Sequence, residues 1–182
     1  SSPDSPALLA ANFPETKLIK EIDSPWEVSF ESDAVQRGPS GTVVFDKLTD
    51  WSKHGNEQIR YYSGLAVYKT TFALDKKNAG KKLYLDLGRV SVMAKVKVNG
   101  KYAGGVWTAP YRIDVTSLLK TGENSIEIEV VNTWVNRIVG DLQLPPEKRI
   151  VETTKITQPD RPLQSSGLLG PVLLIENIKN EN

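Results

Sequence analysis

The sequence predicts an all-β chain that folds as an antiparallel two-sheet β-sandwich of jelly-roll type. Hydrophobic and polar residues alternate in most of the apolar segments, and a period of two is that of a half-buried β-strand. Turn-forming Gly, Pro, Asn and Asp residues separate these segments. No substantial helix is evident, and short strands joined by turns are typical of sandwiches and barrels.

The clearest strands lie between residues 82 and 132. Asn99-Gly100 ends one of them, and this dipeptide tolerates the positive φ angles of a tight hairpin turn. The region is therefore expected to form an antiparallel sheet with tight turns. Its alternating hydrophobic residues fall in three sets: Leu83, Leu85 and Leu87; Val92, Ala94, Val96 and Val98; and Ile126, Ile128 and Val130.

Upstream of this stretch the sequence indicates a linker and then three strands. Residues 1–22 are rich in Ser and Pro and then mildly apolar, so we expect a linker that docks on the edge of the domain. A single domain is expected over residues 23–179, with a tail at 180–182. Its first strands are expected at 26–31, 42–46 and 65–74, with a turn at 36–41 and an irregular aromatic loop at 48–64.

Downstream of the central stretch we expect a long loop and one more strand. Asp114 or Thr116 could cap a single helical turn that ends near Gly122. Residues 133–170 show little periodicity, and their prolines argue against a continuous element. A loop of this length in a compact domain is usually functional or packed against a neighbour. The last strand is expected over residues 171–178.

Composition excludes several classes of function. The 23 basic and 22 acidic residues give a net charge of +1, without the basic excess of a nucleic-acid-binding protein. No apolar run approaches the roughly 20 residues of a membrane span, and the absence of cysteine excludes disulfides and thiolate chemistry. The N-terminus lacks the features of a signal peptide. We interpret the chain as a fragment of a longer one, with no obligate oligomer.

Catalytic motifs are not evident. The chain has no P-loop and no GxGxxG, HExxH or GxSxG motif. The single histidine, His54, lies in a polar loop without a partner motif, so an ordinary surface residue is favoured over a catalytic one. Gly104-Gly105 is better explained as a β-bulge or a close backbone approach than as a phosphate cradle.

Carboxylates are plentiful, but no two of them stand out. Glycoside hydrolysis uses a pair of carboxylates, one as acid and one as base or nucleophile. Glu127 and Glu129 share the polar face of one predicted strand, and such a pair is more often a solvated face than a catalytic dyad. No catalytic residue is therefore assigned among Asp86, Asp114, Glu127, Glu129 and Asp141.

Two groups of aromatic and polar residues are candidates for carbohydrate contact, because sugars stack on exposed aromatic rings and bond to Asn, Arg and Asp side chains. The alternative for Trp107 and Tyr111 is packing in the core or the loop. The alternative for the residues near Trp134 is an internal network in which Arg137 pairs with Asp141. Both alternatives stay open. The candidate carbohydrate-binding residues are Trp107, Tyr111, Trp134, Asn136, Arg137 and Asp141.

Several strings within residues 26–176 resemble a known family. They include RYYSGLAVYKTTFAL, VNGKYAGGVWTAPYRIDVTSLLKTGEN, NTWVNRIVGD and SSGLLGPV. Together they are similar to the galactose-binding-like β-sandwich of glycoside hydrolases. The last two strings look most like the accessory sandwich near the C-terminus of family 106 α-L-rhamnosidases. The sugar-binding domain of family 2 glycosidases has a similar layout.

The resemblance implies a parent enzyme that cleaves glycosidic bonds and whose catalytic carboxylates lie in a separate (β/α)₈ barrel. This chain has no such pattern of strands and helices. The resemblance therefore implies a non-catalytic accessory domain that packs on the barrel of the same chain and helps to shape the carbohydrate site. The alternatives are an autonomous carbohydrate-binding module and a purely structural or protein-interaction sandwich.

The same resemblance implies the surroundings of the chain. We expect its partners to be the catalytic domain and an oligo- or polysaccharide, with no nucleic acid and no membrane. We expect a secreted or periplasmic location. Sandwiches of this kind often hold a structural calcium ion through loop carboxylates and carbonyls. The spacing here shows no recognisable calcium loop, so no metal ligands are assigned and no cofactor is expected.

Overall fold

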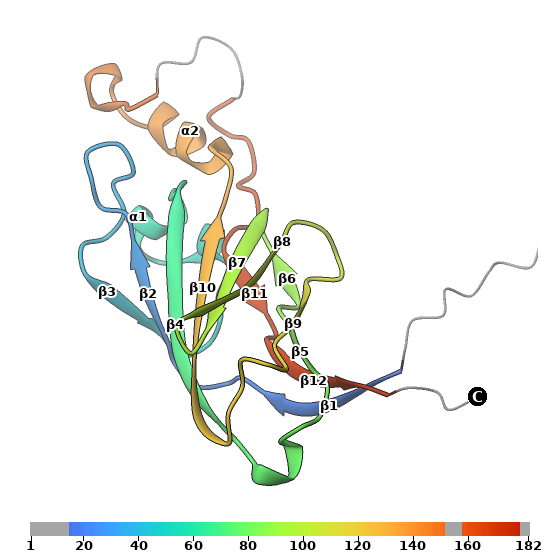
Figure 1. The fold of residues 1–182 in the computed structure, drawn as a ribbon. Helices are drawn as coiled ribbons and strands as arrows, with labels where there is room; N and C mark the ends of the chain where they lie inside the picture. Colours follow the sequence, from blue (N-terminus) through green and yellow to red (C-terminus); the bar gives the residue numbers. More distant parts are fainter. Residues whose placement is uncertain (1–14, 152–157, 179–182) are drawn as a thin grey trace, which may run out of the picture.

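A computed structural model describes residues 15–151 and 158–178 as an antiparallel β-sandwich with few helical segments (Figure 1). One sheet has four strands in the order β1-β12-β5-β9, and the other has six in the order β3-β2-β4-β10-β7-β8. A two-stranded pair, β11-β6, lies beside them. The predicted fold class is confirmed. The expected tail at 180–182 and the first 14 residues of the expected linker lie outside the described residues.

The strands are short, as expected, except for two of ten residues each. Those two, β4 and β10, pair along their full length in the centre of the six-stranded sheet. The strands are β1 (Thr16–Glu21), β2 (Trp26–Phe30), β3 (Thr42–Phe45), β4 (Leu65–Leu74), β5 (Leu83–Asp86), β6 (Arg89–Val90), β7 (Met93–Val98), β8 (Lys101–Val106), β9 (Arg112–Asp114), β10 (Gly122–Val131), β11 (Leu168–Gly170) and β12 (Leu173–Asn177).

The core lies between the two main sheets and is made by the alternating hydrophobic residues. In β10 the residues Ile126, Ile128 and Val130 are buried, while their polar neighbours face outward. β4 shows the same alternation, because both strands have one face on the core and one in solvent. Val92 is the exception to the predicted pattern, since it precedes β7 and is 38% exposed.

The hairpin between β7 and β8 follows the sequence signal. Asn99 and Gly100 have φ angles of 51° and 76°, which suit a tight turn whose central residues both have positive φ. The register then shifts, because Lys97 pairs with Tyr102 but Val96 pairs with Gly104. The residue that the pairing skips is Ala103, so the β-bulge lies directly before Gly104-Gly105, where the sequence placed it. The backbone also approaches closely here, since a Cβ on Gly104 would lie 3.3 Å from Ile113.

The sandwich begins earlier in the chain than the sequence indicated. β1 (Thr16–Glu21) lies inside the segment expected to be a linker, and it pairs with β12 at the edge of the four-stranded sheet. Nearly all of its side chains are exposed. Backbone hydrogen bonds to β12 therefore hold this strand more than side-chain burial does. Because its side chains need not be hydrophobic, the sequence of such a strand shows little alternation of hydrophobic and polar residues.

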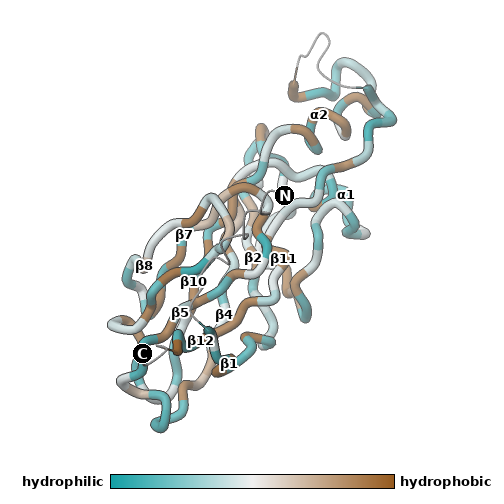
Figure 2. Tube along the Cα trace, turned by 90° about the vertical axis from the view of Figure 1, so that its right-hand side faces the viewer, coloured by the Kyte–Doolittle hydropathy of each residue, from teal (hydrophilic) through white to brown (hydrophobic). Residues whose placement is uncertain are grey.

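The expected long loop at 133–170 contains a helix, which corrects the prediction that no substantial helix is present. α2 spans Val135–Leu142, and a 3-10 turn at Pro146–Lys148 follows it. The helical spacing of Val135, Ile138 and Leu142 was the available signal. A shorter helix, α1 (Glu57–Arg60), and a 3-10 turn (Trp51–Lys53) lie in the expected aromatic loop. Figure 2 shows hydrophobic residues on α2, at one end of the elongated molecule.

An aromatic cluster fastens the aromatic loop and β11 to the core. The Tyr68 hydroxyl accepts hydrogen bonds from Trp51 Nε1 at 2.6 Å and from the Leu168 backbone N–H at 3.2 Å. The rings of Trp51 and Tyr68 are stacked, and both side chains are fully buried. Burial raises the pKa of Tyr68, so its hydroxyl stays neutral.

Candidate functional site

The end of the sandwich that carries α2 brings the two candidate tryptophans together. β7 lies between β10 and β8, and the start of β7 pairs with the ends of both neighbours. Trp107 follows the end of β8, and Trp134 follows the end of β10. Both residues therefore leave the sheet at the same end, which Figure 1 shows next to α2.

Large hydrophobic side chains are exposed at this end of the molecule. Trp107 is 70% exposed and Trp134 is 43% exposed. Val92 and Met93 at the start of β7 are 38% and 37% exposed, and Leu144, just after α2, is 36% exposed. Exposed hydrophobic residues that gather in one region mark interaction surfaces more often than isolated ones do. We call Val92, Met93, Trp107, Trp134 and Leu144 the apolar end.

Tyr111 does not share the exposure of Trp107. Its side chain is half-buried and packs against the core, and its carbonyl accepts a hydrogen bond from the Leu87 backbone at 2.9 Å. The structure therefore separates two residues that the sequence grouped together. Trp107 is free to contact a ligand or a neighbouring domain, whereas Tyr111 has the packing role that was its alternative.

Asn136 holds one loop segment against α2. Its Nδ2 donates to the Gln164 carbonyl at 2.7 Å, and its Oδ1 accepts from the Gln164 backbone N–H at 2.8 Å. Nδ2 also lies 3.3 Å from the Ser166 hydroxyl. Because Asn136 is only 2% exposed, its polar atoms are committed to this attachment.

Arg137 and Asp141 are both buried but do not form an ion pair with each other. Arg137 Nη2 donates to the Gln36 carbonyl at 2.6 Å, and Asp141 Oδ2 accepts from the backbone N–H groups of Ile150 and Val151, each at 2.9 Å. Burial lowers the pKa of Arg137, while the charge of Asp141 opposes this effect. The direct pairing considered in the sequence is replaced by bonds to three backbone groups, one at Gln36 and two at Ile150 and Val151.

Most of the side chains that α2 buries are polar, unlike those of an ordinary surface helix. Its polar residues Asn136, Arg137 and Asp141 are buried against the domain. Of its apolar residues, Val139 is buried as well, whereas Val135, Ile138 and Leu142 are only half-buried. A surface helix normally turns its apolar side toward the core. The apolar side of α2 is thus available to a second surface.

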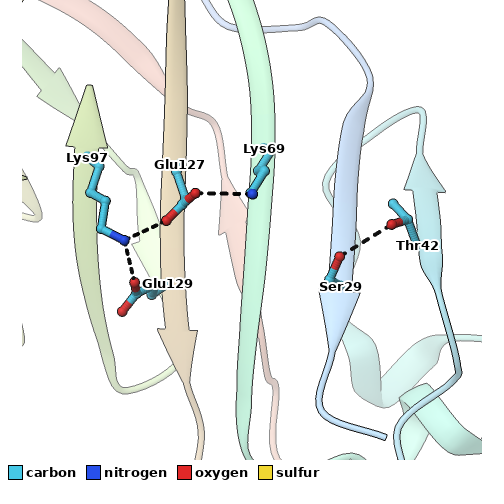
Figure 3. A network of polar contacts seen from close by, with 6 residues as sticks. All are labelled: Ser29, Thr42, Lys69, Lys97, Glu127 and Glu129. Atoms are coloured by element: carbon cyan, nitrogen blue, oxygen red, sulfur yellow. Dashed lines mark hydrogen bonds and ion pairs between the residues drawn. The ribbon is translucent and has the colours of Figure 1, made fainter. Parts of the chain in front are cut away.

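The carboxylates on the six-stranded sheet are held in an ion-pair network (Figure 3). Lys97 Nζ lies 2.7 Å from Glu127 and 3.0 Å from Glu129, and Lys69 Nζ lies 3.3 Å from Glu127. The hydrogen bond from Lys97 lowers the pKa of Glu127. A general acid requires a raised pKa, so this arrangement favours the solvated face over the catalytic dyad.

His54 and Asp86 also have structural partners. His54 Nδ1 accepts from the Asn56 backbone at 3.0 Å, and its ring stacks on Phe45. Asp86 pairs with Arg112 at 2.6 Å. Among residues 15–151 and 158–178, no group of three or more His, Cys, Asp and Glu residues could hold a metal ion. No ligands for the calcium ion that the resemblance allows are identified in this part of the chain.

A cavity of about 230 Å³, lined by both charged and apolar groups, lies between α1 and α2. Arg137 and Asp141 line it together with Arg37 and Tyr61. The sequence did not single out Arg37 or Tyr61, because nothing local relates a turn at residue 37 to a helix at residue 137. A larger cavity, of about 540 Å³, lies over the six-stranded sheet beside Lys69, Lys97 and Glu127. These three charged side chains already pair with each other, so they are less available to a ligand.

The architecture defines a galactose-binding-like β-sandwich of the kind found in glycoside hydrolases. Residues 42–158 match the family described as glycosyl hydrolase 2 galactose-binding domain-like, and the chain belongs to this family. The resemblance identified in the sequence is thereby confirmed.

Three relatives illustrate the match. A protein of Formosa agariphila named "Putative beta-glucuronidase" is 42% identical, over 85% of this chain and 16% of its own length. A rhamnosidase from Novosphingobium sp. PP1Y has a TM-score of 0.81 at 38% identity, over 89% of this chain and 15% of that one. A β-D-glucuronidase of Dictyoglomus thermophilum has a TM-score of 0.62 at 20% identity, covering 92% of this chain and 30% of that one, and it shares the fold alone.

The chain thus corresponds to about one sixth of the length of the first two relatives. None of the helices in the described residues is long and apolar enough to cross a membrane.

Proposed function

We propose that this chain is a non-catalytic accessory domain of a glycoside hydrolase, which packs against the catalytic domain of the same polypeptide and helps to shape the carbohydrate site. The observation that carries the proposal is the apolar end. There, hydrophobic side chains from β7, the segment after β8 and the segment around α2 are each exposed at the same end of the sandwich. The size of the relatives supports it, since a domain of this family forms a small part of each of them.

The half-buried apolar side of α2, made by Val135, Ile138 and Leu142, supports docking through this end. Burying one largely exposed tryptophan is worth on the order of 3 kcal/mol at about 25 cal/mol per Å². Contacts between domains of one chain typically bury roughly 600–1,500 Å². The two tryptophans and the apolar side of α2 would form the centre of such a contact.

The proposed docking puts the domain beside a catalytic site, and the proposed carbohydrate role rests on that docking. The relatives are named as enzymes that act on different sugars, so the proposal concerns glycoside hydrolysis as a class. Enzymes that act on polysaccharides meet their substrates outside the cytoplasm, which supports a secreted or periplasmic location.

The test uses Trp134→Asp and Trp107→Asp in the full-length parent polypeptide. Both tryptophans are exposed, at 43% and 70%, and acidic residues are favourable in the first turn of a helix, where Trp134 lies, so these changes should leave the isolated domain folded. In the parent polypeptide we expect both changes to split one unfolding transition into two and to raise KM at least tenfold for an aryl-glycoside. Calorimetry and steady-state kinetics measure these effects.

The matched control is Leu18→Asp, an equally drastic change at a residue that is 56% exposed on β1, away from α2. It should alter neither the unfolding transitions nor KM. If the tryptophan variants keep a single transition and the original KM, docking through the apolar end is wrong. Polysaccharide binding by the isolated domain that Trp107→Ala abolishes would instead favour an autonomous binding module, and affinity electrophoresis detects it.

A further inference from the structure

We propose that α2 is a hinged element, which opens away from the sandwich while both main sheets stay folded and which closes when its apolar side is covered. The opening concerns this chain alone, whereas the closing rests on the docking proposed above. α2 (Val135–Leu142) lies beyond the end of β10, at one end of the molecule (Figure 1). Its release therefore leaves the strand pairing of the two sheets intact.

The first argument is that α2 has little hydrophobic attachment to the core. Of the side chains that it buries, only Val139 is apolar. Val139 lies outside the hydrophobic cluster that fills the space between the sheets, and Val135, Ile138 and Leu142 are only half-buried. Hydrophobic burial is the main force that holds the elements of a fold together. Elements that lack it open with free energies well below that of global unfolding.

The second argument is that the attachment of α2 is polar, and water can replace it. Asn136, Arg137 and Asp141 hold the helix through hydrogen bonds, with the backbones of Gln36 and Gln164 among their partners. When α2 opens, each of these groups can bond to water instead. Such an exchange changes the free energy far less than the loss of a bond without replacement does.

Two of these buried side chains also gain hydration on opening. Arg137 Nε and Asp141 Oδ1 are closed to solvent and make no hydrogen bond, and the two residues are 7% and 1% exposed. A buried polar atom without a partner destabilises the closed state, because it has lost its water and gained nothing in return. Burial also lowers the pKa of Arg137, which means that the closed state disfavours its charge. Opening relieves both costs.

The third argument is that α2 has little stability of its own. Trp134 at its N-cap makes no side-chain capping bond, and within the described residues of α2 the first turn has no acidic residue and the last turn no basic one. Asp141 instead places a negative charge near the C-terminus, where the helix dipole disfavours it. A helix of eight residues is not stable alone in water. Once released from its contacts, α2 therefore has nothing else to keep it ordered.

The hinge before α2 lies between Asn132 and Trp134. Asn132 is 8% exposed and stays with the sandwich, because its Oδ1 accepts from the Gly64 backbone N–H at 3.0 Å and its Nδ2 donates to the Tyr62 carbonyl at 2.8 Å. Trp134, directly before α2, makes no such attachment through a capping bond. The chain thus passes from a firmly held residue to a weakly held helix within two positions.

Covering the apolar end should close this hinge. Trp134 and the apolar side of α2 lie on the hinged segment, whereas Trp107 follows β8 and stays with the sheet. A single surface that contacts both tryptophans therefore fits only the closed state. A partner that binds one state better shifts the population toward it. Docking would thus order α2, and an undocked chain would leave it free to open.

Hydrogen exchange of backbone amides in this chain, followed by ¹⁵N NMR at increasing urea concentration, tests the opening. We expect the amides from Ile138 to Leu142 to exchange at least about 100-fold faster than those of Tyr68 and Ile128, at a rate that low urea leaves unchanged. Tyr68 and Ile128 lie opposite each other in the central strands and should follow global unfolding. If α2 exchanges at the same urea-dependent rate as these strands, the inference is overturned.

Two variants separate local opening from global unfolding. Ile126→Val shortens a core side chain that is 2% exposed, so it should speed exchange at Tyr68 and Ile128 at least about twofold and leave α2 unchanged. Asn136→Ala removes the bonds to Gln164 that opening breaks, so it should speed exchange in α2 at least about fivefold. Equal acceleration of both regions by Ile126→Val, or unchanged α2 exchange in Asn136→Ala, would contradict the hinge.

The closing is tested by hydrogen exchange and mass spectrometry on the full-length parent polypeptide. Peptides from α2 should exchange at least about tenfold slower there than in this chain alone, and Trp134→Asp in the parent should remove most of that difference. If α2 is equally fast in the parent while the tryptophan variants still split the unfolding transition, the closing is wrong and the docking is kept. If neither effect is seen, the docking itself fails and only the opening is supported.

Discussion

At the scale of single residues, Asp50 shows how one side chain fixes the position of a distant segment. Its carboxylate accepts hydrogen bonds from the Ser165 hydroxyl at 2.6 Å and from the Ser166 backbone N–H at 3.0 Å. It also caps the 3-10 turn at Trp51–Lys53 by accepting from Ser52. Burial alone would raise the pKa of Asp50, but the hydrogen bonds outweigh it and the pKa is lowered.

A lowered pKa predicts a specific dependence of stability on pH. A carboxylate of this kind stabilises the fold above its unfolded pKa of about 3.9, and the contribution is lost as the pH falls through the lower folded value. Asp50→Asn should therefore reduce the free energy of unfolding at pH 7 by about 1–2 kcal/mol. The difference from the unaltered chain should shrink below about pH 4, and urea unfolding at pH 7 and pH 3 measures it.

Asp75→Asn is the matched control for Asp50. Asp75 also precedes a 3-10 turn (Lys76–Asn78), but its side chain makes no capping hydrogen bond. This variant should match the unaltered chain at both pH values. An Asp50→Asn variant that loses the same stability at pH 3 as at pH 7 would contradict the role given to the Asp50 charge.

At the scale of elements, α2 is held by contacts that its own sequence would not favour. Gly140 is a poor residue for the interior of a helix, where glycine costs about 1 kcal/mol relative to alanine. The structure explains it, because a Cβ at this position would lie 2.6 Å from Cγ of Tyr61. The glycine allows α2 to pack directly on the Tyr61 ring after α1.

Gly140→Ala should therefore destabilise the chain despite the better helix propensity. We expect a loss of about 1–3 kcal/mol, since the inserted methyl group overpacks a closed contact. Thermal unfolding followed by circular dichroism measures it. Gly55→Ala is the control, because nothing lies within 4 Å of its added Cβ, and it should be neutral. If Gly140→Ala is stabilising, the packing of α2 on Tyr61 is looser than described.

At the scale of the whole molecule, the edge strand β1 closes the four-stranded sheet although it buries little. It pairs with β12 from Thr16 to Glu21, and most of its side chains are exposed. Without β1, β12 would present its unpaired backbone groups at a sheet edge, and such an edge templates association with other chains.

A chain that begins at residue 22 should therefore fold but associate. We expect a lower unfolding midpoint and a larger mass at high protein concentration than for a chain that begins at residue 15. Calorimetry and light scattering compare the two. Equal midpoints and equal masses would show that the sandwich starts at residue 23, as the sequence alone suggested.

How much the sequence could predict depended on whether the signal was local. The strands at β2, β4, β7 and β10 and the hairpin at Asn99-Gly100 were predictable, since alternation and turn chemistry act between neighbours. α2 was missed because the prolines after it outweighed the spacing of its apolar residues. β1 was missed because an exposed edge strand carries little alternation in burial.

The sequence by itself determined the class of fold and the family resemblance, because a period of two residues specifies which face of each strand turns inward. Only the tertiary structure decided which candidate residues meet. Arg137 bonds to Gln36 across 101 positions, and Ser166 bonds to Asp50 across 116. The packing of the two sheets creates these contacts. It buries the polar side of α2 and leaves Trp107 and Trp134 exposed at the same end.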